Sequence, residues 1–367
     1  MRITLIEPIP LQIPLKVAFK TAKAEQQTAR IVLVKLHTDS SIMGIGECDP
    51  RPHITGETVD SAMTVISTYL SPALRGMQLS EVDDVGKLCA KMDHVLVSNP
   101  SAKAGIDIAA YDALGKSKDA PVHSLLGSMQ RRTLTSSGFT DLGDKAKTEE
   151  DARRCLRLGC KDFKMKVGRH WSDDAERVET ARSILGPNIE LIIDPNQAWS
   201  VRQSIGILGE MKPHLLACEQ PIPWDDLVGL SAVTQAVGVP IIADEAVWSP
   251  FDASTVLRLK AADMVNIKHL KSGGLHRSVE IAGLLQREGV ECMLGSTMET
   301  GVSSAASIHL GVVCPNLKHF DVAPPTDFIV EDIVEGIRWD GLQVEPNQGP
   351  GLGLQLREDL LSKYAIR

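Results

Sequence analysis

The sequence lacks any apolar run of the roughly 18 residues that a membrane-spanning helix requires. It also lacks a basic run, and its formal net charge of -8 argues against a nucleic-acid partner. The first residues show neither the apolar segment nor the cleavage site of a secretory signal peptide, so we expect none. These absences predict a protein with no membrane partner and no nucleic-acid partner.

The seven cysteines are scattered along the chain, and none are spaced as Cys-x-x-Cys. That pattern argues against a zinc site and against a disulfide framework. We interpret Cys155 and Cys160, which share one helix-to-strand stretch, as small apolar residues. A reducing compartment fits this cysteine usage, and we expect the protein in the cytoplasm.

Length and composition indicate a globular protein with two hydrophobic cores. The chain has 367 residues, which is more than one core usually supports. Hydrophobic residues make up 43% and charged residues 23% of the chain, close to the averages for soluble globular proteins, and this argues against disorder.

The central part of the chain alternates short apolar strands with longer helical segments. Asp194, Glu219, Asp244 and Lys268 end four of the strands at intervals of 25, 25 and 24 residues, the length of one strand, loop, helix and return loop. With residues 133–137 as the first strand, eight such units predict an α/β fold, a closed (β/α)8-type barrel. The other seven strands are expected at 161–166, 191–194, 215–219, 240–244, 264–268, 292–296 and 318–321.

The first 120 residues have a different pattern. Strands followed by helices predict an N-terminal α+β domain with its own core, with strands at 3–15, 29–38 and 41–47 and helices at 58–70, 79–92 and 101–116. The tail after Asp321 is too apolar to be disordered, and we expect it to return to the first domain. The predicted division is 1–120 for the N-terminal domain, 121–322 for the barrel and 323–367 for the returning segment.

Charged residues end the predicted barrel strands. The C-terminal ends of barrel strands converge at one mouth, and here they carry Lys164, Lys166, Asp194, Glu219, Asp244 and Lys268. Three carboxylates from consecutive strands suit a hard cation such as Mg2+, while the absence of His and Cys at these points disfavours zinc. Any one of these charges could form a solvated ion pair, but the matched spacing of the set favours a metal site.

The lysines supply acid–base chemistry at the same mouth. Lys164 and Lys166 are two residues apart on one strand, so both side chains point into the mouth. Lys166 ends the second strand and Lys268 the sixth, which lie across the barrel from each other. An ordinary lysine, with a pKa of about 10.4, is a poor base at neutral pH. A neighbouring ammonium and a divalent cation lower such a pKa toward the working range.

The strand-end motifs resemble the signature of the muconate-lactonizing subgroup of the enolase superfamily. They read Lys164-Met165-Lys166, Asp194-Pro195-Asn196, Glu219-Gln220-Pro221, Asp244-Glu245 and Lys268. The resemblance implies an N-terminal capping domain that closes over the mouth, Mg2+ on the three carboxylates, and an enediolate intermediate. The partner we expect is a small-molecule substrate, and we expect a homo-oligomer.

Within the subgroup the chain looks most like the dipeptide epimerases. Residues 19–22, 54–58 and 295–300 resemble their two capping loops and their seventh strand end. The eighth strand reads Asp321-Val322-Ala323 where that family has an Asp-x-Asp pair for the substrate's α-ammonium, and Lys23-Ala24 replaces the arginine of Glu-specific members. We therefore expect a dipeptide without a glutamate side chain, or an N-modified amino acid, as the substrate.

The leading hypothesis is racemisation or epimerisation, in which Lys166 removes the α-proton on one face and Lys268 returns a proton on the other. Candidate substrate contacts are Lys164, Asp321, Glu299 and Thr135, although Glu299 equally suits a helix N-terminus and Thr135 equally suits barrel packing. Arg51 and His53 lie in a candidate capping loop, where they either contact the substrate or are solvated loop residues; we favour the second interpretation. A cycloisomerase or β-elimination enzyme with the same metal site is the alternative, as in muconate cycloisomerase, o-succinylbenzoate synthase or N-acylamino acid racemase. A binding protein that has lost its chemistry is the non-enzymatic alternative.

Overall fold

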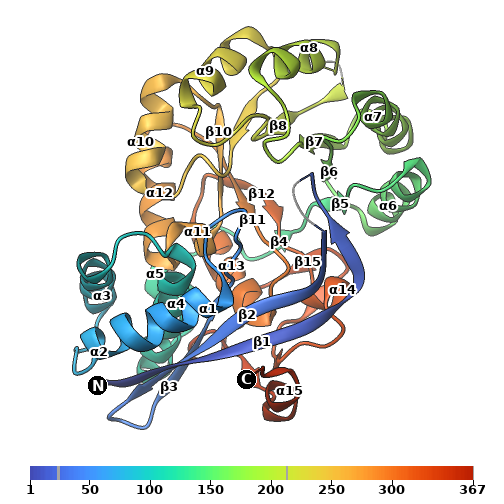
Figure 1. Ribbon diagram of the computed structural model, residues 1–367. Helices are drawn as coiled ribbons and strands as arrows, with labels where there is room; N and C mark the ends of the chain where they lie inside the picture. The colour runs from blue at the N-terminus through green and yellow to red at the C-terminus, as the bar shows by residue number, and fades with distance from the viewer. Residues whose placement is uncertain (23–24, 212–213, 367) are drawn as a thin grey trace.

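The computed structural model describes residues 1–22, 25–211 and 214–366 (Figure 1). Lys23 and Ala24, on which part of the expected specificity depends, lie outside the described residues. Lys212 and Pro213 lie outside them as well.

Eight parallel strands form one sheet that curls into a nearly closed barrel, which confirms the predicted fold. The two ends of the sheet are joined by a hydrogen bond from Ser137 N to Phe320 O at 2.8 Å. Inward-facing apolar side chains such as Ile192, Ile242 and Met293 fill the interior. In sequence and spatial order the strands are β5 (Gly138–Thr140), β6 (Asp162–Lys166), β7 (Glu190–Asp194), β8 (Ala217–Glu219), β9 (Ile241–Ala243), β10 (Met264–Ile267), β11 (Cys292–Gly295) and β12 (Leu317–Asp321).

Helices between the strands form the outer layer of the barrel (Figure 1). Side chains cap several of them: Asp144 accepts a hydrogen bond from Lys147 N, and Ser249 accepts one from Asp252 N. None of the helices in the described part of the chain is long and apolar enough to cross a membrane. They are α6 (Lys145–Leu158), α7 (Trp171–Leu185), α8 (Val201–Met211), α9 (Leu227–Ala236), α10 (Pro250–Leu259), α11 (His269–Ser272), α12 (Leu275–Arg287) and α13 (Gly301–Val313).

The first strand of the barrel differs from the prediction. Of residues 133–137, only Ser137 bonds to a barrel strand: β4 (Leu134–Thr135) pairs antiparallel with β15 (Gln343–Val344) instead. The barrel begins with β5, whose Gly138 packs so closely that a Cβ would lie 2.5 Å from Cys155 Sγ and 2.8 Å from Phe163 Cδ2. Glycine is a weak strand former, and the partner of β4 is about 200 residues away. The local pattern therefore gave the wrong strand.

An antiparallel sheet and a set of helices form the N-terminal domain, as predicted. The sheet has the order β1 (Ile3–Lys20), β2 (Glu25–Thr38), β3 (Met43–Cys48). Because β1 and β2 extend beyond their predicted ends, their hairpin reaches the barrel, with Phe19 opposite Gln26 near its end (Figure 1). The helices are α1 (Val59–Thr64), continued by the π-helix η1 (Val65–Leu70), then α2 (Ser71–Leu74), α3 (Val82–Val95), α4 (Pro100–Lys118) and α5 (Val122–Leu126).

The C-terminal segment contacts both the barrel and the N-terminal sheet. Ile366 N donates to Pro10 O at 3.0 Å, and Leu15 forms a β-bridge with Ile329. Its contacts agree with the expected return to the first domain, while the boundaries at 120 and 322 stay a prediction. The elements are α14 (Pro325–Phe328), β13 (Val334–Glu335), β14 (Trp339–Asp340), β15, β16 (Gln355–Leu356) and α15 (Glu358–Tyr364).

One cysteine pair was interpreted wrongly. Cys155 and Cys160 form a disulfide, with their Cα atoms 5.3 Å apart. The reason lies in the end of α6: the chain turns after Leu158, and Cys160 N donates to Cys155 O at 3.1 Å. That turn brings the second side chain back over the first, at a separation that a disulfide allows.

Gly274 lies at a closely packed junction between α4 and α12. Gly274 precedes α12 with φ +119, and a Cβ there would overlap the carboxylate and Cβ of Asp107 in α4. Asp107 Oδ2 accepts a hydrogen bond from Leu275 N at 2.5 Å, so the carboxylate cannot move without losing it. We expect Gly274→Ala to lower the free energy of unfolding by about 2 to 4 kcal/mol, measured by denaturant titration.

The matched control is Gly283→Ala in the interior of α12. A Cβ at Gly283 meets only Arg287 Nη1, at 3.8 Å, and the backbone is helical. This substitution should raise the free energy of unfolding by about 0.5 to 1 kcal/mol. Equal effects of the two substitutions would show that the α4–α12 junction is not tightly packed.

Candidate active site

A cavity of about 90 Å³ lies at the C-terminal ends of the barrel strands, beneath the N-terminal domain. It brings together four residues that the sequence placed at one mouth: Lys164, Lys166, Lys268 and Asp321. The remaining lining residues come from both domains and from the C-terminal segment. They include Phe19, Thr21, Gln26, Arg51, His53 and Ile54 from the N-terminal domain and Ser137, Phe139, Asn196, Glu245, Ser296, Thr297, Met298, Ala323 and Phe328 from the rest of the chain.

The three predicted metal-binding carboxylates are buried among the lysines. Lys166 Nζ donates to Asp194 Oδ2 at 2.5 Å, and Lys268 Nζ donates to Asp244 Oδ2 at 2.5 Å. Lys164 Nζ donates to Glu219 Oε1 at 3.0 Å. Each buried carboxylate therefore has an ammonium group from a different lysine, which offsets much of the cost of burying the charges.

Lys164 also reaches the eighth strand. Its Nζ donates to Asp321 Oδ2 at 2.9 Å and lies 3.4 Å from Asp194 Oδ2. Burial opposes the ammonium form, but the carboxylates of Asp321 and Glu219 outweigh it and hold the pKa of Lys164 well above its usual value. The pKa of Lys268 is raised in the same way, against burial, by Asp244 and Glu219.

These directions are opposite to the lowering that the sequence predicted for lysines at this mouth. The prediction assumed that the carboxylates face a divalent cation, and here they face the ammonium groups. The same crowding acts on the carboxylates themselves. Burial, and then the Asp194 carboxylate, raise the pKa of Glu219 to about 8. A divalent cation bound at these carboxylates would favour the charged form of Glu219.

Two buried carboxylate oxygens accept no hydrogen bond from the described residues, although each lies within 3.4 Å of a lysine ammonium group. Asp244 Oδ1 is buried and accepts no hydrogen bond from the described residues. Glu219 Oε2 is buried as well and lies 2.8 Å from Lys164 Nζ without hydrogen-bond geometry. Carboxylate oxygens from neighbouring strands are ligands that Mg2+ accepts, so the residues present fit a hard divalent cation.

A shell of polar groups orients the carboxylates. Asn266 Nδ2 donates to Glu219 Oε1 at 3.0 Å, and Gln220 Oε1 accepts a hydrogen bond from Asp244 N at 2.9 Å. Lys271 Nζ, fully buried, donates to Asp244 O at 2.7 Å. Asn266 and Lys271 were not among the site residues predicted from the sequence. Asn266 could have been found, because it lies two residues before Lys268 on the inward face of β10, whereas Lys271 lies in α11 and leaves no such signal.

Arg51 joins the N-terminal domain to the barrel. Its side chain is only 6% exposed, so its interpretation as a solvated loop residue is wrong. Arg51 Nε lies 2.7 Å from Asp49 Oδ1, and Nη2 donates to Met298 O at 3.0 Å. Nη1 donates to Gln26 in β2, and Thr297 donates to Asp49. The loop around Arg51 is thereby held against the end of β11, which closes this side of the cavity.

Three phenylalanines form an apolar wall of the cavity. Phe19 of β1 stacks on Phe139 of β5 with ring centroids 5.7 Å apart. Phe328 of α14 contacts both edge-on, at 6.3 Å and 6.5 Å. This end of the cavity is apolar, and the acidic residues among those that line the cavity are Glu245 and Asp321.

Two predicted substrate contacts do not line the cavity. Thr135 lies in β4, opposite Gln343 of β15. Glu299 is buried at the start of α13, where its Oε1 accepts a hydrogen bond from Ser304 Oγ at 3.3 Å and burial raises its pKa well above the usual value. The structure therefore brings Lys164 and Asp321 to the cavity, but not Thr135 or Glu299.

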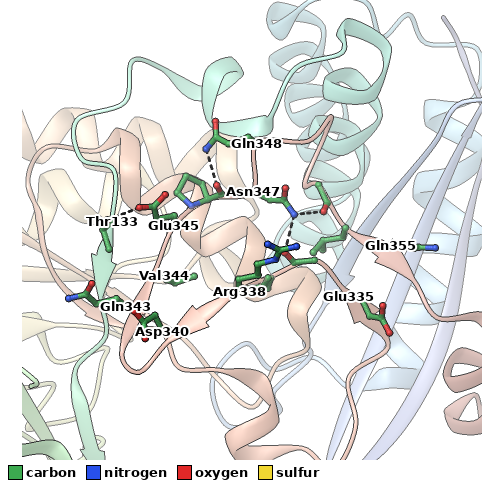
Figure 2. A pocket seen from close by; sticks show the side chains of 15 residues that line it. Thr133, Glu335, Arg338, Asp340, Gln343, Val344, Glu345, Asn347, Gln348 and Gln355 are labelled. Carbon is green, nitrogen blue, oxygen red and sulfur yellow. Dashed lines mark hydrogen bonds between the residues drawn. The ribbon is translucent and has the colours of Figure 1, made fainter. Parts of the chain in front are cut away.

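A larger cleft, about 1010 Å³, opens on the C-terminal segment (Figure 2). Its polar groups serve the segment itself: Asn347 Nδ2 donates to Gly336 O at 3.1 Å, and Thr133 Oγ1 donates to Glu345 Oε1 at 3.3 Å. None of the predicted strand-end residues lines this cleft. The candidate active site is therefore the smaller cavity at the barrel mouth.

Fold and site together define an enzyme of the enolase superfamily. Residues 147–360 match the family described as "Enolase C-terminal domain-like", and residues 2–127 match the "Mandelate racemase / muconate lactonizing enzyme, N-terminal domain". The chain belongs to this family. Its relatives include epimerases, racemases and cycloisomerases, so it falls among the isomerases of the superfamily.

Particular relatives cover nearly the whole chain. It is 34% identical to the L-Ala-D/L-Glu epimerase of Clostridium acetobutylicum over 94% of this chain and 96% of that protein. The crystal structure of N-succinyl Arg/Lys racemase from Bacillus cereus superposes with a TM-score of 0.94 and 30% identity over 100% of this chain and 99% of that one. The dipeptide epimerase from Cytophaga hutchinsonii, solved with Mg and D-Ala-L-Val, has a TM-score of 0.93 and 29% identity over 99% and 98%.

Proposed function

We propose that the protein catalyses racemisation or epimerisation at the carbon next to a substrate carboxylate. The observation that carries this proposal is the placement of Lys166 and Lys268, which end the second and sixth barrel strands and both line one cavity. A Mg2+ ion held by Asp194, Glu219 and Asp244 would supply positive charge opposite the substrate carboxylate.

The chain's own residues account for the proton transfers. Lys166 Nζ removes the α-proton from one face of the substrate, and Lys268 Nζ delivers a proton to the other face. Lys164, already bonded to Glu219 and Asp321, offers a further positive charge beside the substrate carboxylate as the enediolate forms. Arg51 and Phe19, from the N-terminal domain, exclude water by covering the mouth.

The substrate in this proposal is a dipeptide without a glutamate side chain or an N-modified amino acid. Asp321 is the one acidic group at the end of β12, and it is bonded to Lys164. A free α-ammonium would have to share that carboxylate, because Ala323 provides no second one. The phenylalanine wall favours an apolar substituent next to it. The Cys155–Cys160 disulfide removes the cysteine-based argument for the cytoplasm. Homo-oligomerisation and a cytoplasmic location stay predictions.

Specificity gives a direct test. We expect the wild-type enzyme to convert L-Ala-L-Glu roughly 100-fold less efficiently than a dipeptide with an apolar C-terminal residue, because an unpaired buried carboxylate costs several kcal/mol. Ala323→Asp should raise kcat/KM for unblocked dipeptides and leave N-acylated substrates unimproved. The measurement is kcat/KM across a dipeptide and N-acyl amino acid panel. L-Ala-L-Glu as the best substrate would show that Lys20 or Arg51 takes the role of the missing arginine.

A cycloisomerase or β-elimination enzyme is the second candidate. The observation that favours it is Ala323, since such substrates carry no α-ammonium and need no second carboxylate. Incubation of the enzyme and Mg2+ in deuterated water with the substrate panel, with β-hydroxy carboxylates and with an unsaturated dicarboxylate separates the two. Deuterium uptake with inversion supports epimerisation, whereas loss of water or ring closure without inversion supports the alternative.

A further inference from the structure

A second group of possible metal ligands lies at the other end of the barrel. Asp162 begins β6, Glu190 begins β7 directly opposite it in register, and His319 lies in β12. The apolar layer that includes Ile192 and Met293 separates this end from the mouth. The group is therefore distinct from the candidate active site, and it does not depend on the proposed reaction.

The geometry of this group suits a small divalent cation. One ligand atom from each of the three side chains lies within 4.8 Å of the other two. His319 Nδ1 is 2.9 Å from Asp162 Oδ2 and 3.8 Å from Glu190 Oε2. Ligands bonded to a tetrahedral zinc ion at 2.0–2.1 Å lie about 3.3 Å apart. The two observed separations bracket that value, so small side-chain rotations would complete the site.

An unsatisfied carboxylate oxygen points independently to a ligand. The side chains of Asp162 and His319 are each only 9% exposed, and Asp162 Oδ1 accepts no hydrogen bond from the described residues. A buried carboxylate oxygen without a partner is costly. Glu190, whose side chain is 49% exposed, leaves the group open to solvent and gives an ion a way in.

We propose that Asp162, Glu190 and His319 bind a divalent cation of borderline character, such as Zn2+, at the N-terminal end of the barrel. One imidazole and two carboxylates match that class of ion better than Mg2+. The ion stabilises the fold, because β12 and β5 are the two ends of the sheet and are joined in the described residues by the bond from Ser137 to Phe320. A cation on His319, Asp162 and Glu190 ties β12 to β6 and β7 across this seam.

The test uses Zn2+ alone with the full chain after removal of metals by a chelator. Equilibrium dialysis should show one equivalent of Zn2+ fewer per chain for Glu190→Gln than for the wild type. Glu190 is half exposed, so this variant should fold. Glu291→Gln is the matched control, because Glu291 is exposed near His319 but does not belong to the group; it should bind as much Zn2+ as the wild type.

Thermal unfolding separates this site from the mouth. Zn2+ should raise the Tm of Asp244→Asn, in which the mouth has lost a ligand, but should not raise the Tm of that variant when Glu190→Gln is added to it. His319→Gln should repeat the Glu190→Gln result. Equal Zn2+ binding and equal Tm shifts in the wild type and Glu190→Gln would overturn the proposal and leave a plain His319–Asp162 ion pair.

Discussion

In the Lys268→Ala enzyme, α-proton exchange with deuterated water is expected to continue for one stereoisomer of the substrate, while interconversion of stereoisomers falls by roughly 10³-fold or more. Lys166→Ala should show the converse, with exchange of the other stereoisomer only. The reason is that the two lysines end strands on opposite sides of the barrel and line one cavity. The measurement is α-proton exchange followed by NMR on each pure stereoisomer.

The ion pair between Lys268 and Asp244 must be controlled for in this experiment. Because Lys268 Nζ bonds Asp244 Oδ2 at 2.5 Å, its removal also leaves a carboxylate without its partner. Lys268→Arg keeps the positive charge but cannot act as a base near neutral pH, so it should lose stereoinversion as Lys268→Ala does. Lys161→Ala, exposed before the start of β6, should be as active as the wild type. Near wild-type stereoinversion in Lys268→Ala would refute the two-base mechanism and favour a single-lysine isomerase.

Asp244→Asn should reduce turnover by roughly 10³-fold, and added Mg2+ should not restore it, because several kcal/mol of charge stabilisation depend on the bound cation. Asparagine is the better substitution than alanine. Asp244 is 1% exposed and pairs with Lys268 and Lys271. Both substitutions remove the charge, but the amide oxygen of asparagine can still accept a hydrogen bond from these buried ammonium groups, whereas alanine offers no acceptor. The measurement is the exchange rate as a function of Mg2+ concentration.

Asp225→Asn is the control for this experiment, because Asp225 is an exposed carboxylate in the loop after β8. It should keep the wild-type rate and the wild-type dependence on Mg2+. Full activity of Asp244→Asn in excess chelator would exclude a metal ion held by the three strand-end carboxylates. Loss of the folded state, checked by circular dichroism, would instead assign Asp244 a role in balancing the buried lysines.

The barrel and the residues at its mouth could be predicted from the sequence because both follow from local, periodic rules. Parallel strands of a barrel bring their C-terminal ends to one side, and alternation along β6 points Lys164 and Lys166 the same way. The spacing of Asp194, Glu219 and Asp244 placed the carboxylates at the same mouth, where Asp194 and Glu219 pair with these lysines and Asp244 pairs with Lys268. Their roles in binding metal and moving protons stay predictions.

Contacts between distant segments could be decided only by the tertiary structure. Residues 133–137 have the pattern of a barrel strand, but Leu134 and Thr135 pair with β15, which lies more than 200 residues later in the chain. Arg51 was predicted to be solvated, but in the structure its side chain donates a hydrogen bond to Met298 O, just after β11. The turn after α6 brings Cys160 next to Cys155, with which it forms a disulfide.

The same holds for His319, which lies 157 residues from Asp162 in the sequence. A periodic pattern determines which face a side chain occupies, because that depends on the next few residues. What lies opposite that face depends on how the whole chain packs.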